Sequence, residues 1–148
     1  MRLVLIFLGL VTLLMGDEIA WNSSFEAAKA KAQKEDKLIY VVITSETCRW
    51  CRKLEATTLE KPAVVKNINS KYVPVALTRG KDSYPPCLKA KMVPMSYFLT
   101  PQGRVIYSVP GFWIEEDYLS IMGDVERKYK KQKKALAEAQ VTTGQVVK

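Results

Sequence analysis

Residues 44–54 read Thr-Ser-Glu-Thr-Cys-Arg-Trp-Cys-Arg-Lys-Leu, and they decide the fold because they join elements of two kinds. The apolar, β-branched run at residues 38–43 before them predicts a strand, and the residues from Arg52 to Leu59 after them are typical of a helix. Cys48 and Cys51 therefore stand at a strand-to-helix junction with the spacing C-x-x-C. This pattern is typical of a dithiol/disulfide redox site.

The position of the two sulfurs predicts different roles for them. Unpaired backbone N–H groups at a helix N-terminus favour negative charge, so the first sulfur is held as a thiolate. Three residues later in a helix, the second sulfur comes round close enough to bond to the first. We therefore predict Cys48 as the attacking thiolate and Cys51 as the buried resolving thiol.

A zinc site and an inert structural disulfide are the alternative interpretations of C-x-x-C. Zinc takes four ligands, and the chain has three cysteines and no histidine, which leaves only Cys87 as a further soft ligand. We therefore predict no metal site of this kind. The absence of histidine also excludes a Cys–His protease, because no imidazole is present to act as a base. A structural disulfide would have a very low reduction potential and react slowly.

The N-terminus has the form of a secretory signal peptide, which we assign to residues 1–16. A single basic residue, Arg2, precedes an apolar run from Leu3 to Leu14 that contains no charged residue. That run is shorter than the roughly 20 residues of a membrane-spanning helix, although an uncleaved N-terminal anchor is the alternative. We predict export to the periplasm, where protein disulfides are made and reduced. One domain over residues 17–140 and a flexible tail over residues 141–148 complete the chain.

The formal net charge is +8, and the basic residues concentrate at residues 127–134. Such a run is able to bind nucleic acid or an anionic surface. No nucleic-acid recognition motif accompanies it, and an exported protein rarely meets nucleic acid, so we expect no such partner. A solvated helix face is the favoured interpretation, and contact with acidic partners or a membrane surface is the alternative.

The rest of the chain alternates between helical and extended patterns. Ser23 and Glu26 have the spacing of a capping box, which predicts a helix start there. The first predicted helix runs from this start to residue 34, and further helices are predicted at residues 63–67, at residues 87–91 and from residue 114 onward. Strands are predicted at residues 38–44, 71–77, 92–99 and 104–109.

This order of elements resembles the thioredoxin fold from about Trp21 to Lys130. The features that carry the resemblance are the C-x-x-C motif, Val93-Pro94 some forty residues later, a hairpin at residues 96–109, and Gly111 before the last helix. The sequence looks most like exported thioredoxin-like proteins related to the C-terminal domain of periplasmic thiol:disulfide interchange reductases. The resemblance implies an α/β thioredoxin fold, with a central mixed β-sheet flanked by helices and an extended C-terminal helix.

The resemblance also implies the substrate contacts. Val93-Pro94 would form a cis-proline loop against the disulfide, where the Val93 backbone pairs with an extended substrate chain. Thr47, Arg49, Trp50 and Pro94 would shape the contact. The implied partners are protein disulfide substrates and a membrane-bound thiol electron donor. No cofactor is expected beyond the redox-active disulfide itself.

The sequence differs from the thioredoxin pattern at one position, and it contains a third cysteine outside the C-x-x-C motif. Thioredoxins carry a buried Asp six residues before the first Cys, and that position is Val42 here. Either Glu46 or a water molecule deprotonates the resolving thiol in its place, or the second step of the reaction is slower. Cys87 would fall on a helix before the cis-proline loop, outside bonding reach of Cys48. We expect a structural or unpaired role for Cys87.

Two functions of different classes follow from these patterns. The first is an exported thiol:disulfide oxidoreductase, with protein-disulfide reductase favoured over oxidase or isomerase. The alternative is a soft-metal chaperone or a non-catalytic adaptor on the same fold, in which Cys48, Cys51 and Met95 hold Cu(I). The absence of Met- or His-rich stretches counts against this alternative.

Overall fold

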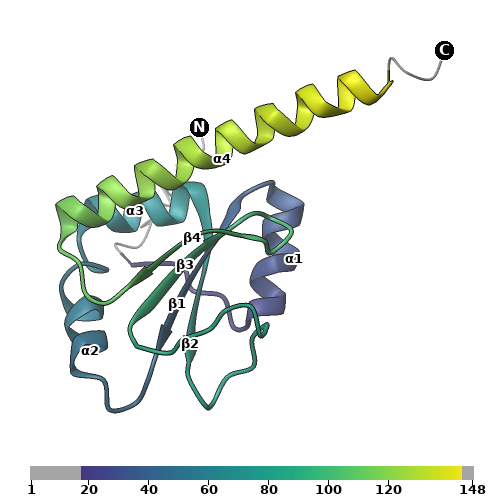
Figure 1. Ribbon diagram of the computed structural model, residues 1–148. Coiled ribbons are helices and arrows are strands. Elements are labelled where there is room, and N and C mark those ends of the chain that lie inside the picture. Colours follow the sequence, from purple (N-terminus) through teal and green to yellow (C-terminus); the bar gives the residue numbers. More distant parts are fainter. Residues whose placement is uncertain (1–17, 145–148) are drawn as a thin grey trace, which may run out of the picture.

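A computed structural model of the chain describes residues 18–144 (Figure 1). The predicted signal peptide lies outside these residues, and the predicted tail is described only as far as Gly144, where the last helix ends. Within this described part, no helix is both long and apolar enough to cross a membrane. The predicted domain boundaries stay predictions.

The centre of the fold is a mixed four-stranded sheet with the strand order β2-β1-β3-β4. β1 pairs in parallel with β2 and antiparallel with β3, and β3 and β4 form an antiparallel hairpin. β1 is a central strand covered on both faces, which explains its continuous apolar run. The strands are β1 (Leu38–Thr44), β2 (Tyr72–Thr78), β3 (Met95–Leu99) and β4 (Val105–Pro110).

Helices cover both faces of this sheet. α1 packs Phe25, Ala28 and Ala32 against the face that carries Ile39 and Val41. The other face packs against the apolar sides of the remaining helices. This arrangement confirms the predicted mixed sheet flanked by helices, with an extended C-terminal helix. The helices are α1 (Phe25–Glu35), α2 (Arg49–Ala56), α3 (Pro62–Lys71) and α4 (Glu115–Gly144).

The capping-box prediction is wrong by one residue. The N-cap of α1 is Ser24, whose Oγ accepts a hydrogen bond from the Ala27 N–H at 3.1 Å. The first helical residue is Phe25, which is buried in the core and so fixes where the helix begins. Both adjacent serines are suitable N-cap residues, and the packing of Phe25 in the core determines that Ser24 is the one that caps the helix.

The short helix predicted at residues 87–91 is also wrong, since these residues form turns and irregular chain. Three of their carbonyl groups accept hydrogen bonds from distant side chains. Tyr97 donates its hydroxyl to the Lys89 carbonyl at 2.6 Å, and Arg79 Nη1 donates to the carbonyls of Ala90 and Lys91 at 3.0 and 3.2 Å. These tertiary contacts satisfy the carbonyls without helix formation.

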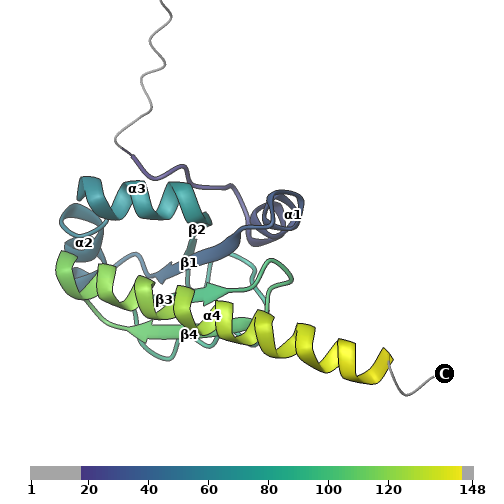
Figure 2. The ribbon, with the colours of Figure 1, turned by 90° about the horizontal axis from the view of Figure 1, so that it is seen from above.

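α4 carries the predicted basic run and extends beyond the sheet. Figures 1 and 2 show its C-terminal half, coloured yellow, continuing past the strands, and every residue from 130 to 140 is exposed. Its first half is anchored by Tyr118, Met122 and Val125, which are fully buried. Core packing therefore holds only the N-terminal part of this helix.

Candidate active site

The two motif cysteines form a disulfide at the start of α2, with a Cα–Cα distance of 5.2 Å. Cys48 is the N-cap of the helix, and its Sγ accepts a hydrogen bond from the Cys51 N–H at 3.1 Å. Cys51 is only 1% exposed, whereas Cys48 is half-buried. A partner molecule thus has access to the first sulfur and not to the second.

α2 begins earlier than the sequence predicted, at Arg49 in place of Arg52, because Cys48 itself caps the helix. Its first turn contains no acidic residue but holds Arg49 and Arg52, and Lys53 follows in its last turn. Positive charge there opposes the helix dipole, and it favours the thiolate form of a neighbouring cysteine.

Three loops meet at one end of the sheet, and the strand register places them there. β1 leads into the Cys48 turn, and Ile43 near its end pairs with Met95 at the start of β3. Met95 also pairs with Pro110 at the end of β4. The loop before β3 and the loop after β4 therefore flank the turn that carries the disulfide.

The Val93–Pro94 peptide bond is cis, which is the conformation that the resemblance implies. Pro94 is buried, and its carbonyl accepts a hydrogen bond from the Gly111 N–H at 2.8 Å. Gly111 has a φ of +85°, a conformation that residues with a side chain rarely adopt. This bond ties the loop before β3 to the loop after β4.

The predicted contact residues fall into two groups. Arg49 and Trp50 are exposed on the first turn of α2, and Thr47 is exposed in the turn before it. Val93 and Pro94 occupy the loop before β3 and are more buried. The structure thus brings both groups to the same end of the sheet.

An aromatic contact that the sequence analysis missed links these segments. Phe112, in the loop after β4, packs against Trp50 with the ring centroids 6.0 Å apart. Lys53 Nζ lies 5.1 Å from the Trp50 ring centroid and 4.6 Å from that of Phe112. Trp50 itself is 51% exposed. The one available signal was an aromatic residue directly after Gly111, which does not reveal its partner.

Val42 occupies the position, six residues before Cys48, at which thioredoxins carry a buried Asp. Val42 is buried in the core. Glu46, one of the expected substitutes, is exposed, and its carboxylate lies 3.7 Å from the ammonium of Lys81. Its action on the resolving thiol stays a prediction.

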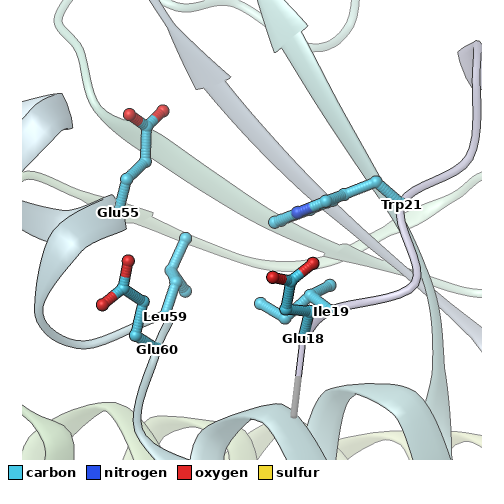
Figure 3. Close-up of a pocket in the computed structure, with 6 residues that line it drawn as sticks. All are labelled: Glu18, Ile19, Trp21, Glu55, Leu59 and Glu60. Atoms are coloured by element: carbon cyan, nitrogen blue, oxygen red, sulfur yellow. The ribbon is translucent and has the colours of Figure 1, made fainter. Parts of the chain in front are cut away.

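A second carboxyl group, that of Glu55, lies one helical turn after Cys51 on α2. Although Glu55 is an exposed residue, partial burial of its carboxyl group raises its pKa, and the Arg52 guanidinium partly opposes this rise. Its side chain faces a pocket of about 530 Å³, across which Figure 3 shows Trp21. The sequence analysis missed Glu55, although its i, i+4 spacing from Cys51 was a usable signal.

Three hydroxyl groups form a buried cluster next to Val42. Tyr118 binds the Tyr40 hydroxyl at 2.6 Å and Ser96 Oγ at 2.7 Å, and Ser96 is the strand partner of Val42. Burial raises the pKa of Tyr118 to about 12 and that of Tyr40 well above its usual value. These hydroxyls are therefore neutral near pH 7 and provide no base.

The third cysteine, Cys87, is a free and exposed thiol. This agrees with the expected unpaired role, although its loop is not the helix that the resemblance implied. Among the described residues, no group of three or more His, Cys, Asp and Glu side chains is placed to hold a metal ion.

A four-stranded mixed sheet with a C-x-x-C disulfide at the start of α2 defines the class of thioredoxin-like disulfide oxidoreductases. The chain belongs to the Thioredox_DsbH family, described as a protein of unknown function, DUF255, whose model matches residues 11–148.

Solved structures share this fold. A DsbH oxidoreductase superposes with a TM-score of 0.61 at 17% identity, over 73% of this chain and 84% of the other. A thioredoxin from Thermus thermophilus gives 0.62 at 19% identity, over 73% and 87%. The oxidised C-terminal domain of DsbD from Neisseria meningitidis gives 0.56 at 18% identity, over 72% and 97%. At these identities the likeness concerns the fold alone.

A curated relative also matches part of the sequence. The uncharacterized protein B0495.5 of Caenorhabditis elegans is 30% identical over 94 residues, which is 56% of this chain. The match spans 13% of the length of that protein.

Proposed function

We propose that this protein is an exported thiol:disulfide oxidoreductase that reduces disulfides in other proteins. The observation that carries the proposal is the Cys48–Cys51 disulfide, whose first sulfur is accessible at a positively charged helix N-terminus while the second is buried. An inert structural disulfide would need neither this difference in access nor the adjacent charges.

The reaction begins from the reduced dithiol. The Cys48 thiolate attacks one sulfur of a substrate disulfide, that S–S bond breaks, and the other substrate sulfur leaves as a thiolate and takes up a proton. The Cys51 thiol then loses its proton and attacks Cys48 Sγ, which releases the second substrate sulfur. Two electrons pass to the substrate, and the Cys48–Cys51 disulfide remains.

Glu55 is the proposed acceptor of the Cys51 proton. It lies one turn further along the same helix, and partial burial raises its pKa, which favours proton uptake by the carboxylate. This assignment would replace the acidic residue that is absent at Val42, and it is an alternative to Glu46.

The substrate chain would lie in an extended conformation along the Val93 backbone, next to Thr47 and Trp50. The meeting of the three loops at one end of the sheet supports this placement. A membrane-bound thiol donor would return the protein to its dithiol form, and the exposed basic half of α4 is available for an acidic partner or membrane surface.

Catalysis of insulin disulfide reduction by dithiothreitol tests the activity. Cys48→Ser should abolish catalysis, and Cys51→Ser should accumulate mixed disulfides because the resolving thiol is lost. Cys87→Ser is the matched control and should behave as the native protein. Full turnover by Cys48→Ser would refute the assignment.

Equilibration with glutathione buffers tests the direction of the reaction. A reduction potential near about −270 mV, the thioredoxin value, supports a reductase. A value near about −120 mV, typical of a strong disulfide donor, would reverse the proposed direction.

A further inference from the structure

The surface beside Cys48 combines aromatic rings with positive charge. The Lys53 ammonium lies over the rings of both Trp50 and Phe112, and the Arg49 guanidinium carbon lies 5.9 Å from the Trp50 ring centroid. The electron-rich ring faces attract these cations and hold them in place, but they leave the charges unneutralised. We call these four residues the aromatic–cation cluster.

Among the residues that the structure describes, the two cations of this cluster have no carboxylate partner. Across residues 18–144, every ion pair present involves other side chains, and the nearby Glu46 pairs with Lys81. Helix stability does not explain the charge of Arg49, since a cation at a helix N-terminus is unfavourable, whereas Lys53 lies in the last turn of α2. The cluster therefore presents an apolar surface with two free positive charges to an approaching molecule.

We propose that the aromatic–cation cluster selects acidic substrate segments, in which an Asp or Glu lies close to the disulfide cysteine and beside an apolar residue. This inference rests on the proposed reductase function and names the substrate class of that site. The occupant is a polypeptide, because the cluster adjoins Cys48 at the end of the sheet where the loops before β3 and after β4 also lie.

The recognition uses two simple contacts. The substrate carboxylate binds Lys53 and Arg49, and its apolar neighbour packs against the exposed parts of Trp50 and Phe112. An exposed ion pair of this kind changes an affinity by about two- to fivefold, so two pairs together give a preference of about four- to 25-fold. Salt should weaken this preference because the charges are exposed.

The test compares two synthetic peptides that contain the same intramolecular disulfide and one Phe. The first has Asp on both sides of its cysteines, and the second has Lys at the same positions. Second-order rate constants for their reduction by the reduced full-length protein are measured at low and high salt. We expect the acidic peptide to react about fivefold to tenfold faster at low salt, with a smaller difference at high salt.

Charge-changing variants locate the source of the preference. Lys53→Met should reduce the ratio of the two rates, and Lys53→Glu should bring it to one or below. Phe112→Ala should also reduce the ratio, because the ammonium loses one of its two ring contacts. The matched control is Lys66→Glu on α3, an exposed residue outside the cluster, which should leave the ratio unchanged.

Reduction of 2-hydroxyethyl disulfide, a small neutral substrate, separates recognition from thiolate reactivity. A variant that only changes the Cys48 thiolate alters all three rates together, whereas a recognition variant alters the peptide ratio. Equal rates for both peptides with the native protein would overturn this inference and leave the reductase proposal intact. Failure to reduce any of the three substrates would refute the reductase proposal itself.

Discussion

The N-termini of α2 and α4 lie in the same fold and follow opposite rules. α4 opens with Glu115, Glu116 and Asp117, whose negative charges favour a helix N-terminus. α2 opens with Arg49, has no acid in its first turn, and leaves Trp50 half exposed. The charges in the first turn of α4, which packs in the core, stabilise that helix. The charges in the first turn of α2, which carries the disulfide, destabilise it, as expected at a functional site.

The burial of the two helix starts differs in the same way. Tyr118, in the first turn of α4, is fully buried and bonded to two other hydroxyls. α2 is held in the core by Cys51 and Leu54, while its other side chains are exposed. Substitutions at the start of α4 should therefore act on stability, and those at the start of α2 on chemistry.

The largest expected effect compares truncation of one aromatic residue in each helix. Tyr118→Ala should lower the free energy of unfolding by about 3–5 kcal/mol, because it leaves a cavity in the core. Trp50→Ala should change it by about 0.5 kcal/mol or less, because that ring is half exposed, yet it should slow peptide reduction. Urea unfolding of the oxidised proteins measures both values. Equal losses of stability would contradict the comparison.

Removal of a single hydroxyl group sharpens this test. Tyr118→Phe should lower the free energy of unfolding by about 1–3 kcal/mol, since it leaves the buried hydroxyls of Tyr40 and Ser96 without their shared partner. The control is Tyr107→Phe on β4, an exposed residue for which little change is expected. The same urea titration applies, and a neutral Tyr118→Phe would show that the cluster contributes no stability.

Neutralising one charge in each first turn should give effects of opposite sign. Glu116→Gln should lower the free energy of unfolding by about 0.3–1 kcal/mol, and Arg49→Gln should raise it by a similar amount. Both differences should shrink at high salt, because both side chains are exposed. If both substitutions changed the free energy of unfolding in the same direction, the helix dipole would not explain the difference between the two helix starts.

The smallest expected effect is the pH dependence that Glu55 gives to α2. Burial raises its pKa, so the folded protein binds this proton more tightly than the unfolded chain does. The resulting stabilisation is complete below the unfolded-state pKa and is lost as the pH rises through the folded-state pKa. Glu55→Gln should therefore gain stability relative to the native protein between pH 4 and pH 7. Urea titrations at both pH values test the sign, and a relative loss would contradict it.

Local sequence patterns correctly predicted the elements that a characteristic run or spacing of residues identifies. The bounds of β1 agree with the prediction at Leu38 and Thr44, because a run of buried β-branched residues identifies a central strand. The C-x-x-C motif likewise predicted a disulfide at a helix start. The helix predicted over residues 87–91 is wrong. The carbonyls of this segment bind the side chains of Arg79, which directly follows β2, and Tyr97 on β3, and no local pattern encodes those contacts.

The sequence by itself predicted the fold class, through its resemblance to the thioredoxin fold. It also predicted the bond between Cys48 and Cys51 and the burial of Cys51, through the spacing of the two residues at a strand-to-helix junction. Only the tertiary structure decided that Phe112 meets Trp50, that a hydroxyl cluster lies beside Val42, and that the pKa of Glu55 is raised. Burial and electrostatic surroundings arise from residues far apart in the chain. They exist only once the strand register has brought those residues together.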